Sequence, residues 1–205
     1  MMINLSPPVF FQRLFPNLVW SIPNEDNAVF LTFDDGPTPD VTPWVLDRLN
    51  RFEAKATFFC LGKNVDRYPS IFEAIKGNGH TLGNHTYSHL RGWEVGTSEY
   101  VQDVDLANQT IRSNLFRPPY GRIKPSQVRE LRQRYRLIMW DVLSMDYSSN
   151  ITRRSCANYV IKHLHPGAII VFHDSLKAQR NLRYALPRVL EAIRDKGMVC
   201  RGIEG

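Results

Sequence analysis

Short apolar runs alternate with amphipathic stretches along most of the chain. The apolar runs predict strands near residues 28–33, 56–60, 80–84, 115–117, 136–141, 168–173 and 198–202. The stretches between them predict helices at about 40–52, 63–78, 98–114, 125–134, 152–165 and 181–196. This alternation indicates an α/β fold with a parallel sheet. About seven such units in one domain can close into a barrel, and an open doubly wound sheet is the alternative.

The first 25 residues interrupt this pattern. Their apolar residues are broken by prolines and by Gln12 and Arg13, and no basic segment precedes them, so they do not resemble a signal peptide. We expect residues 1–25 to form an arm that packs its aromatic side chains on a single domain spanning 26–205. The lack of a signal peptide favours a cytoplasmic location, whereas a processed N-terminus would place the protein in the cell envelope or outside the cell. No apolar run approaches the roughly 18 residues of a membrane span.

Composition and charge narrow the classes of function. The 205 residues are 43% hydrophobic and 22% charged, as in an ordinary globular domain with its own core. The net charge of +6 suits an acidic polymer or a nucleic acid, but no nucleic-acid reading motif accompanies it, so no nucleic-acid partner is expected. Phosphate-binding glycine loops are absent, which argues against nucleotide binding. Three cysteines without CxxC spacing argue against a disulfide framework and against a thiolate zinc site.

Polar side chains follow five of the predicted strands, at the point where each strand ends. They are Asp34 and Asp35, His85 and His89, Arg117 to Gly121, Asp141 to Asp146, and His173 with Asp174. The carboxyl ends of parallel strands meet at one rim, where the active sites of α/β folds form. Five such coincidences predict a site at this rim.

His85 and His89 are spaced as two metal ligands on one face of a helical turn. Because Thr86 follows His85, the HExxH protease pattern is absent, and a third ligand must come from elsewhere. Asp34 and Asp35 supply candidates: one carboxylate completes an open three-ligand site and the other serves as a base. The residues alone leave open which aspartate has which role. They also leave open that the two histidines are ordinary surface residues.

A candidate acid and a candidate anchor complete the rim. His173 ends an apolar strand, and its ordinary pKa of about 6.5 suits proton transfer, although a core histidine is the plain alternative. Asp141 and Asp146 are both candidate partners for it. Arg117 precedes two prolines and can hold a carboxylate, or it can be an exposed residue in a proline turn.

Taken together and in order, these motifs resemble a known family. They are TFDDG, H-x-x-x-H, R-P-P-Y-G, W-D-V followed by D-Y, and V-F-H-D, and they run from about Val29 to Val199. The set is similar to the five motifs of the NodB-homology polysaccharide deacetylases, carbohydrate esterase family 4. The resemblance implies a distorted (β/α)7 barrel and hydrolysis of an N- or O-acetyl group on a sugar polymer. It also implies one divalent metal, expected to be Zn²⁺, with Co²⁺, Ni²⁺ or Mn²⁺ as alternatives.

The resemblance separates the two aspartates. It implies that Asp34 is the general base and that Asp35 is a metal ligand together with His85 and His89. It further implies that Arg117 pairs with Asp34 and orients it.

The remaining motifs imply roles for five more residues. Tyr120 would offer a backbone N–H to the oxyanion, and His173 would be the general acid, with Asp146 setting its protonation. Val171 stands where the family often has leucine at the acetyl-methyl pocket, and Tyr147 stands where it typically has tryptophan. These two departures predict an altered pocket wall and leave every implied ligand and base in place.

The substrate is the least specified part of the prediction. We expect an N-acetylglucosamine-containing oligo- or polysaccharide, such as chitooligosaccharide or peptidoglycan. A xylan O-deacetylase, a sugar deformylase and a non-catalytic sugar-binding module are the alternatives. Trp93, together with Tyr87, is a candidate sugar-stacking platform, with core packing as the plain alternative. The oligomeric state is left open.

Overall fold

The computed structural model describes residues 16–205 and forms one parallel sheet with helices on its outer face. The strands are β1 (Leu18–Val19), β2 (Ala28–Asp34), β3 (Thr57–Cys60), β4 (Thr81–Asn84), β5 (Leu115–Phe116), β6 (Arg136–Ile138), β7 (Val142–Leu143), β8 (Ile169–His173) and β9 (Val199–Cys200). The helices are α2 (Thr42–Arg51), α3 (Gly62–Arg67), α4 (Pro69–Gly77), α5 (Thr97–Ile111), α6 (Pro125–Leu131), α7 (Arg153–Lys162) and α8 (Gln179–Asp195), and a 3₁₀ turn spans Pro119–Gly121. All paired strands run parallel, in the order β1-β6-β5-β4-β3-β2-β8-β7, with β9 on β2.

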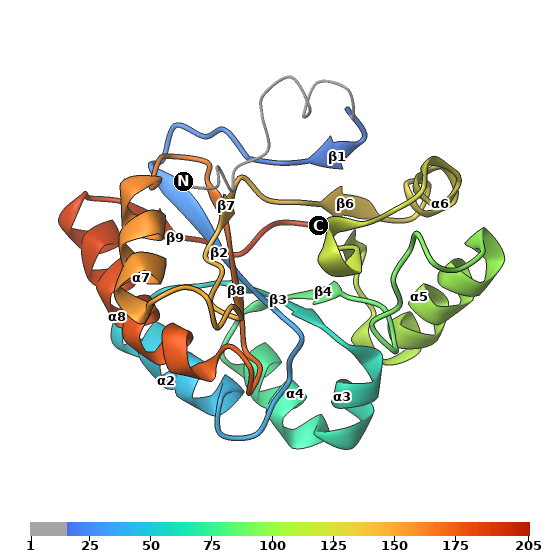
Figure 1. Ribbon diagram of the computed structural model, residues 1–205, viewed down its shortest axis with the longest axis horizontal. Coiled ribbons are helices and arrows are strands. Elements are labelled where there is room, and N and C mark those ends of the chain that lie inside the picture. Colours follow the sequence, from blue (N-terminus) through green and yellow to red (C-terminus); the bar gives the residue numbers. More distant parts are fainter. Residues whose placement is uncertain (1–15) are drawn as a thin grey trace.

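The sheet curls into an incomplete barrel, so the predicted α/β fold is confirmed (Figure 1). Helices cover three sides of the curled sheet: α7 and α8 lie on the first, α2 to α4 on the second, and α5 and α6 on the third. On the remaining side, β1 runs across the opening. The residues after β1 reach the start of β8 through a bridge between Ser21 and Ala168 and a 2.9 Å hydrogen bond from the Ile22 N–H to the Gly167 carbonyl. These contacts tie the two margins of the curled sheet together.

Strand β2 is the central element, and all seven of its residues are buried. Side chains alternate between the two faces of a strand, so Phe33 points toward the helices and Thr32 and Asp34 point into the barrel. On the helical side Phe33 stacks between Phe58 and Phe172, with ring centroids 5.0 and 6.1 Å apart. The apolar face of β2 therefore fixes the strand that delivers Asp34 to the rim.

Several predicted boundaries are wrong for identifiable reasons. The helix predicted at 63–78 is two helices, because Pro69 has no N–H to continue α3, and the backbone turns at Tyr68 with φ −131°. The strand predicted at 136–141 ends at Ile138 as β6, and the short strand β7 after it was not predicted. Helix α7 ends at Lys162, three residues before the predicted end.

The predicted N-terminal arm, residues 1–25, lies mostly outside the residues that the structure describes, which start at Pro16. Within its described part, Leu18 and Trp20 are buried in the core, and Leu18–Val19 pairs with β6. The domain boundary after residue 25 stays a prediction.

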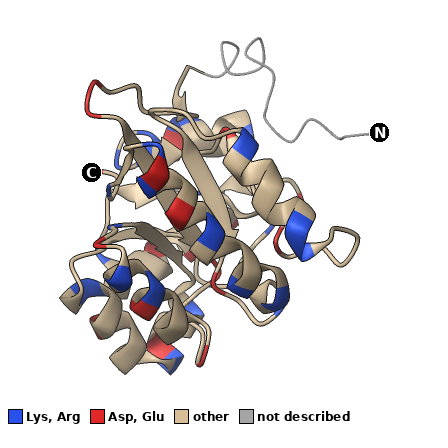
Figure 2. Ribbon diagram, turned by 90° about the vertical axis from the view of Figure 1, so that its left-hand side faces the viewer, with Lys and Arg blue, Asp and Glu red and all other residues tan. Residues whose placement is uncertain are grey.

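On the surface that carries α7 and α8, α7 has Arg and Lys and no acidic residue, whereas α8 has residues of both charges (Figure 2). None of the described helices has the length and apolar composition needed to cross a membrane.

Candidate active site

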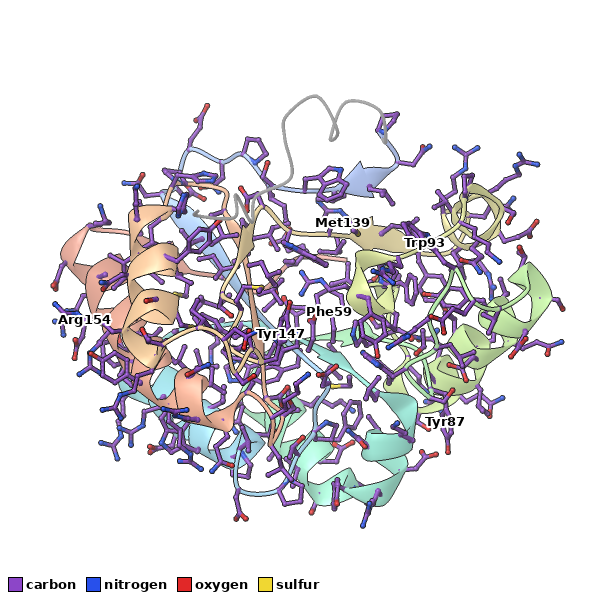
Figure 3. All side chains as sticks on the ribbon, viewed as in Figure 1. Phe59, Tyr87, Trp93, Met139, Tyr147 and Arg154 are labelled. Atoms are coloured by element: carbon purple, nitrogen blue, oxygen red, sulfur yellow. The ribbon has the colours of Figure 1, made fainter. Side chains whose placement is uncertain are left out.

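Most of the polar residues at the strand ends line or adjoin one cavity of about 520 Å³. Eight residues proposed from the sequence line it: Asp34, Asp35, His85, His89, Tyr120, Tyr147, Val171 and His173. Arg117 and Asp146 lie directly behind this lining and hold two of its members. Figure 3 shows Tyr147 and Phe59 near the centre of the curled sheet, where this site forms.

Asp34 is held by a fully buried arginine. Arg117 donates from Nη1 to Asp34 Oδ1 at 2.8 Å and to Thr32 Oγ1 at 2.6 Å. Its Nη2 donates to the carbonyl of Met139 at 2.9 Å, and its guanidinium lies 4.1 Å from the ring centroid of Phe59. Because the guanidinium is held on several sides, the carboxylate of Asp34 has a fixed position at the wall of the cavity.

Asp35, His85 and His89 form a cluster with the geometry of a metal site. One donor atom from each lies within 4.8 Å of the others. Asp35 Oδ1 is 3.2 Å from His89 Nε2 and 3.8 Å from His85 Nε2, yet this buried oxygen has no well-aligned hydrogen-bond donor among the described residues. Two imidazole nitrogens and one carboxylate oxygen this close together, with no aligned donor on the buried oxygen, fit an open N,N,O site for a divalent cation.

The protonation states of the cluster suit cation binding. Burial lowers the pKa of His85 to about 4, which keeps the imidazole neutral, and the Arg117 carbonyl lies 2.7 Å from its Nδ1. That contact places the proton on Nδ1 and leaves Nε2 as the ligand atom. Burial alone raises the pKa of Asp35, but the His89 imidazole and the charge of His173 hold it well below its usual range.

The two histidines do not lie on a helical turn, so that prediction is wrong. His85 directly follows β4, and the loop after it contains left-handed residues at Thr86, with φ 67°, and at His89, with φ 64°. The carboxylate of Asp103 on α5 anchors this loop by accepting hydrogen bonds from the backbone N–H groups of Tyr87 and Ser88. Loop geometry, and not helical periodicity, brings the two imidazoles together.

A second buried carboxylate shapes the loop that carries Asp35. Asp174 accepts a hydrogen bond from the Gly36 N–H at 3.1 Å and one from Thr42 Oγ1 at 2.5 Å. A Cβ on Gly36 would lie 2.0 Å from an oxygen of Asp174, so only glycine fits there. Burial raises the pKa of Asp174 to about 7. This clamp holds Asp35 in its left-handed conformation, with φ 79°, and thereby turns its side chain away from that of Asp34.

His173 is paired with Asp146 on the opposite wall. His173 Nδ1 lies 2.8 Å from Asp146 Oδ1, and the His173 backbone N–H donates to Oδ2 at 2.8 Å. Burial lowers the pKa of His173, but the adjacent carboxylate of Asp146 outweighs it and raises the pKa to about 9. The Tyr147 ring meets the imidazole edge-on at 4.9 Å. The pair presents a protonated imidazole to the cavity.

Asp141, the alternative partner for His173, lies elsewhere. It precedes β7 at the amino end of β8, where it accepts a hydrogen bond from the Ile169 N–H at 2.8 Å and pairs with His165 Nε2 at 2.8 Å. The sequence alone could not show which aspartate pairs with His173, because Asp141 and Asp146 both lie within six residues of the end of the same apolar run. In the structure Asp141 lies between β6 and β7, whereas Asp146 lies after β7.

Comparison with known proteins identifies the fold and the chemistry. Residues 21–137 match the family described as Polysaccharide deacetylase. The chain is 32% identical to a peptidoglycan-N-acetylglucosamine deacetylase of Bacillus cereus, over 87% of this chain and 67% of the relative. It is 30% identical to a chitooligosaccharide deacetylase of Azorhizobium caulinodans, over 75% and 76%. A solved peptidoglycan N-acetylglucosamine deacetylase superposes with a TM-score of 0.88 at 29% identity, covering 94% of each chain.

This chain belongs to the polysaccharide deacetylase family. The prediction from the five motifs is thereby confirmed, and the protein is a carbohydrate deacetylase, a hydrolase that acts on the acetyl groups of sugars.

The deacetylase presents Tyr120 at the mouth of the cavity. Tyr120 lies in the 3₁₀ turn with φ 60°, and no acceptor for its backbone N–H is present among the described residues. Its ring packs against that of His89 at 4.7 Å, and the Arg91 guanidinium lies 5.0 Å from its centroid. The turn therefore leaves this backbone N–H without an acceptor in a residue whose ring contacts the Asp35–His85–His89 cluster.

The predicted aromatic platform does not line this deacetylase cavity. Trp93 is 59% exposed and lines a separate apolar cavity of about 400 Å³, where its Nε1 donates to the Ile123 carbonyl at 3.3 Å (Figure 3). Tyr87 packs over Gly62, and its hydroxyl donates to Asp66 at 3.0 Å. Neither ring lines the cavity that contains Asp34 and His173.

Sequence reasoning missed three cations of the lining, Arg91, Arg122 and Lys177. Nothing in their local sequence distinguishes them from other surface cations. They come to the cavity from three separate loops, and only the fold shows that they surround it.

Proposed function

We propose that the protein is a metal-dependent deacetylase of glycans that contain N-acetylglucosamine, such as peptidoglycan or chitooligosaccharide. One observation carries this proposal: a three-ligand cluster, an arginine-held carboxylate and a carboxylate-held histidine surround the same cavity. The printed names of the relatives, which are peptidoglycan and chitooligosaccharide deacetylases, support the choice of substrate.

In this proposal Asp35, His85 and His89 hold the cation. When bound, a divalent cation supplies Lewis acidity, which lowers the pKa of water and polarises the acetyl carbonyl. Zn²⁺ suits two imidazoles and one carboxylate, and Co²⁺, Ni²⁺ and Mn²⁺ are alternatives.

Asp34 is the general base of the proposed reaction. Its bond to Arg117 fixes one oxygen, and the other accepts a proton from the water that attacks the acetyl carbon. The Tyr120 N–H donates to the oxygen that becomes negatively charged in the tetrahedral intermediate.

His173 is the general acid. The amide nitrogen leaves poorly as an anion, so Nε2 of the imidazolium gives it a proton as the carbon–nitrogen bond breaks. Asp146 keeps the imidazole charged and oriented through Nδ1. The products are acetate and a free amine. Val171 and Tyr147 line the wall near His173, where the acetyl methyl group would lie.

The test is acetate and free-amine release from a panel of acetylated glycans by metal-reconstituted protein. We expect equal amounts of acetate and amine from N-acetylglucosamine oligomers, abolished by a chelator and restored by Zn²⁺. Acetate without amine would instead indicate O-deacetylation, as on xylan. Release that persists after complete metal removal would contradict the proposed dependence on a cation.

A further inference from the structure

Asn181 is a buried polar residue on α8 for which the proposed chemistry has no role. Its side chain is 5% exposed, and it shares a helix face with Ala185 and Val189, which belong to the apolar core. The same face is thus apolar one and two turns further along the helix. An amide at such a position is costly to bury unless it forms hydrogen bonds, so its contacts indicate what it does.

The side-chain amide of Asn181 joins α8 to residues 144–148, the loop that follows β7. Its Nδ2 donates to the backbone carbonyl of Asp146 at 2.9 Å and to that of Ser148 at 3.1 Å. Among residues 16–205, no other group donates to either carbonyl. Both hydrogens of one NH₂ group therefore hold two points of the same loop.

The 144–148 loop needs contacts from outside itself. Its internal bonds run from the Asp146 N–H to Ser144 Oγ at 3.2 Å and from the Ser148 N–H to the Met145 carbonyl at 2.9 Å. Met145 is left-handed, with φ 59°, a conformation that costs free energy in a residue with a Cβ. Asn181 supplies bonds on both sides of Tyr147, directly after this strained residue.

The same loop delivers two side chains to the wall of the cavity that contains His173. Asp146 accepts hydrogen bonds from the His173 backbone N–H and Nδ1, each at 2.8 Å, and the Tyr147 ring meets the imidazole edge-on at 4.9 Å. His173 ends β8, whereas Asp146 and Tyr147 follow β7. The fit between imidazole and carboxylate therefore depends on how the loop lies against β8 and α8, and Asn181 fixes that relation.

We propose that Asn181 is a positioning residue for the general acid: its amide fixes the 144–148 loop so that the Asp146 carboxylate meets His173 Nδ1. The proposal rests on the role of His173 proposed above. Asn181 does not line the cavity, so it acts only through the loop residues that it holds.

The test uses Asn181→Leu, which keeps a side chain of similar size and removes both donors. Asn24→Leu is the matched control, because Asn24 Nδ2 also bridges two carbonyls, those of Ile22 at 3.0 Å and Ala28 at 3.1 Å, at the amino end of β2. Both variants lose an amide that joins two carbonyls, and only the first loses it beside the acid. Asn181→Ser is the second variant: its hydroxyl donates to one carbonyl and its small side chain leaves room for water, so it should fold and give an intermediate result.

The first readout is the proton NMR signal of the His173 Nδ1–H, assigned by its absence from His173→Gln. A hydrogen bond to a carboxylate moves such a signal far downfield. We expect the signal to move upfield, or to be lost by exchange with water, in Asn181→Leu and to stay in place in Asn24→Leu. An unchanged signal in Asn181→Leu and Asn181→Ser would overturn the proposal, whatever the substrate of the enzyme.

The second readout compares an N-acetylglucosamine oligomer, whose amine must be protonated as it leaves, with para-nitrophenyl acetate, whose phenolate leaves without a proton. A positioned acid contributes roughly 10²–10⁴-fold, so partial misplacement should lower kcat for the oligomer by about tenfold and kcat for the ester by no more than about twofold. Zn²⁺ affinity should be unchanged. Equal losses on the two substrates would indicate damage to the whole site and would overturn the positioning role.

The outcomes separate this proposal from the one on which it rests. Wild-type protein that releases no acetate from the oligomer would contradict the proposed function, while the NMR signal would still decide whether Asn181 positions the pair. Wild-type activity with an unaltered ratio of oligomer to ester turnover in Asn181→Leu would contradict the positioning role alone.

Discussion

Replacing Asp146 by asparagine tests whether the His173–Asp146 pair acts through charge. Both carboxylate oxygens of Asp146 accept hydrogen bonds, one from the His173 backbone N–H and one from Nδ1, each at 2.8 Å. Asparagine has one oxygen and one NH₂ group, so it cannot accept both. If its oxygen keeps the backbone N–H, the NH₂ group faces Nδ1 and favours the neutral imidazole. The substitution therefore removes the charge and also opposes the protonated form.

The expected size follows from the pKa of His173. With Asp146 the pKa of His173 is about 9. Without it, burial lowers the pKa while the carboxylates of Asp35 and Asp34 still raise it, so we take the ordinary pKa of about 6.5 as the reference for the variant. At pH 7 the protonated fraction then falls from nearly all to about a quarter, a loss of about fourfold. At pH 9 it falls from about a half to about 0.3%, a loss of about 150-fold. A bound cation lowers both pKa values, so the difference between the two proteins persists.

The assay is kcat/KM for acetate release between pH 5.5 and 10 with metal-saturated protein. The alkaline limb of the wild-type profile should move to lower pH by about 2.5 units in Asp146→Asn. Asp141→Asn is the matched control, because Asp141 pairs with His165 at the other end of β8, and its alkaline limb should stay in place. A loss in Asp146→Asn that is the same at every pH would refute an electrostatic role and leave only a structural one.

Four further results are expected. Asp34→Asn should bind Zn²⁺ as the wild type does and lose most turnover, and unimpaired acetate release would contradict its role as base. Arg117→Met should lower the free energy of unfolding by about 3–5 kcal/mol, measured with urea, because it leaves the buried Asp34 without its partner. Thr42→Val should weaken Zn²⁺ binding, measured by competition with a chromophoric chelator. The substitution removes the hydrogen bond that Thr42 donates to Asp174, and Asp174 then holds the loop of Asp35 less firmly. Unchanged affinity would refute the role of Asp174 in positioning Asp35. Burial lowers the pKa of His80 to about 4, whereas the unfolded chain takes up the proton at about pH 6.5. The free energy of unfolding should therefore be highest above pH 6.5 and fall by about 2–3 kcal/mol as the pH falls from 6.5 to 4. His80→Gln should flatten this part of the curve of stability against pH.

The strands and the rim were predictable because their signals are local. An apolar run such as Ala28–Asp34 is buried on both faces in this fold, and the polar residue that ends it must lie at the rim. Pro69 marks the break between α3 and α4 in the sequence, but the amphipathic pattern continues on both sides of it and favours a single helix.

What the sequence could not supply depends on contacts across large separations. Asp146 and Asp141 look alike in the sequence, and only the bond of Asp141 to the start of β8 separates them. The turn of the His85–His89 loop depends on Asp103, which lies in a helix on the outer face of the sheet. Trp93 looked like a sugar platform because it follows the histidines closely, yet its loop carries it to a different cavity.

The different roles of the neighbouring aspartates follow from the backbone. Asp34 is the last residue of β2, so the alternation of the strand directs it into the barrel, where the buried Arg117 fixes it. If the strand continued, Asp35 would point to the apolar side, where its charge would be costly to bury. The left-handed turn at Asp35, held by Asp174 through Gly36, instead brings its carboxylate to the two imidazoles. The proposed division into base and ligand therefore depends on where β2 ends, and a change to the Asp174 clamp should affect the proposed metal site before it affects the proposed base.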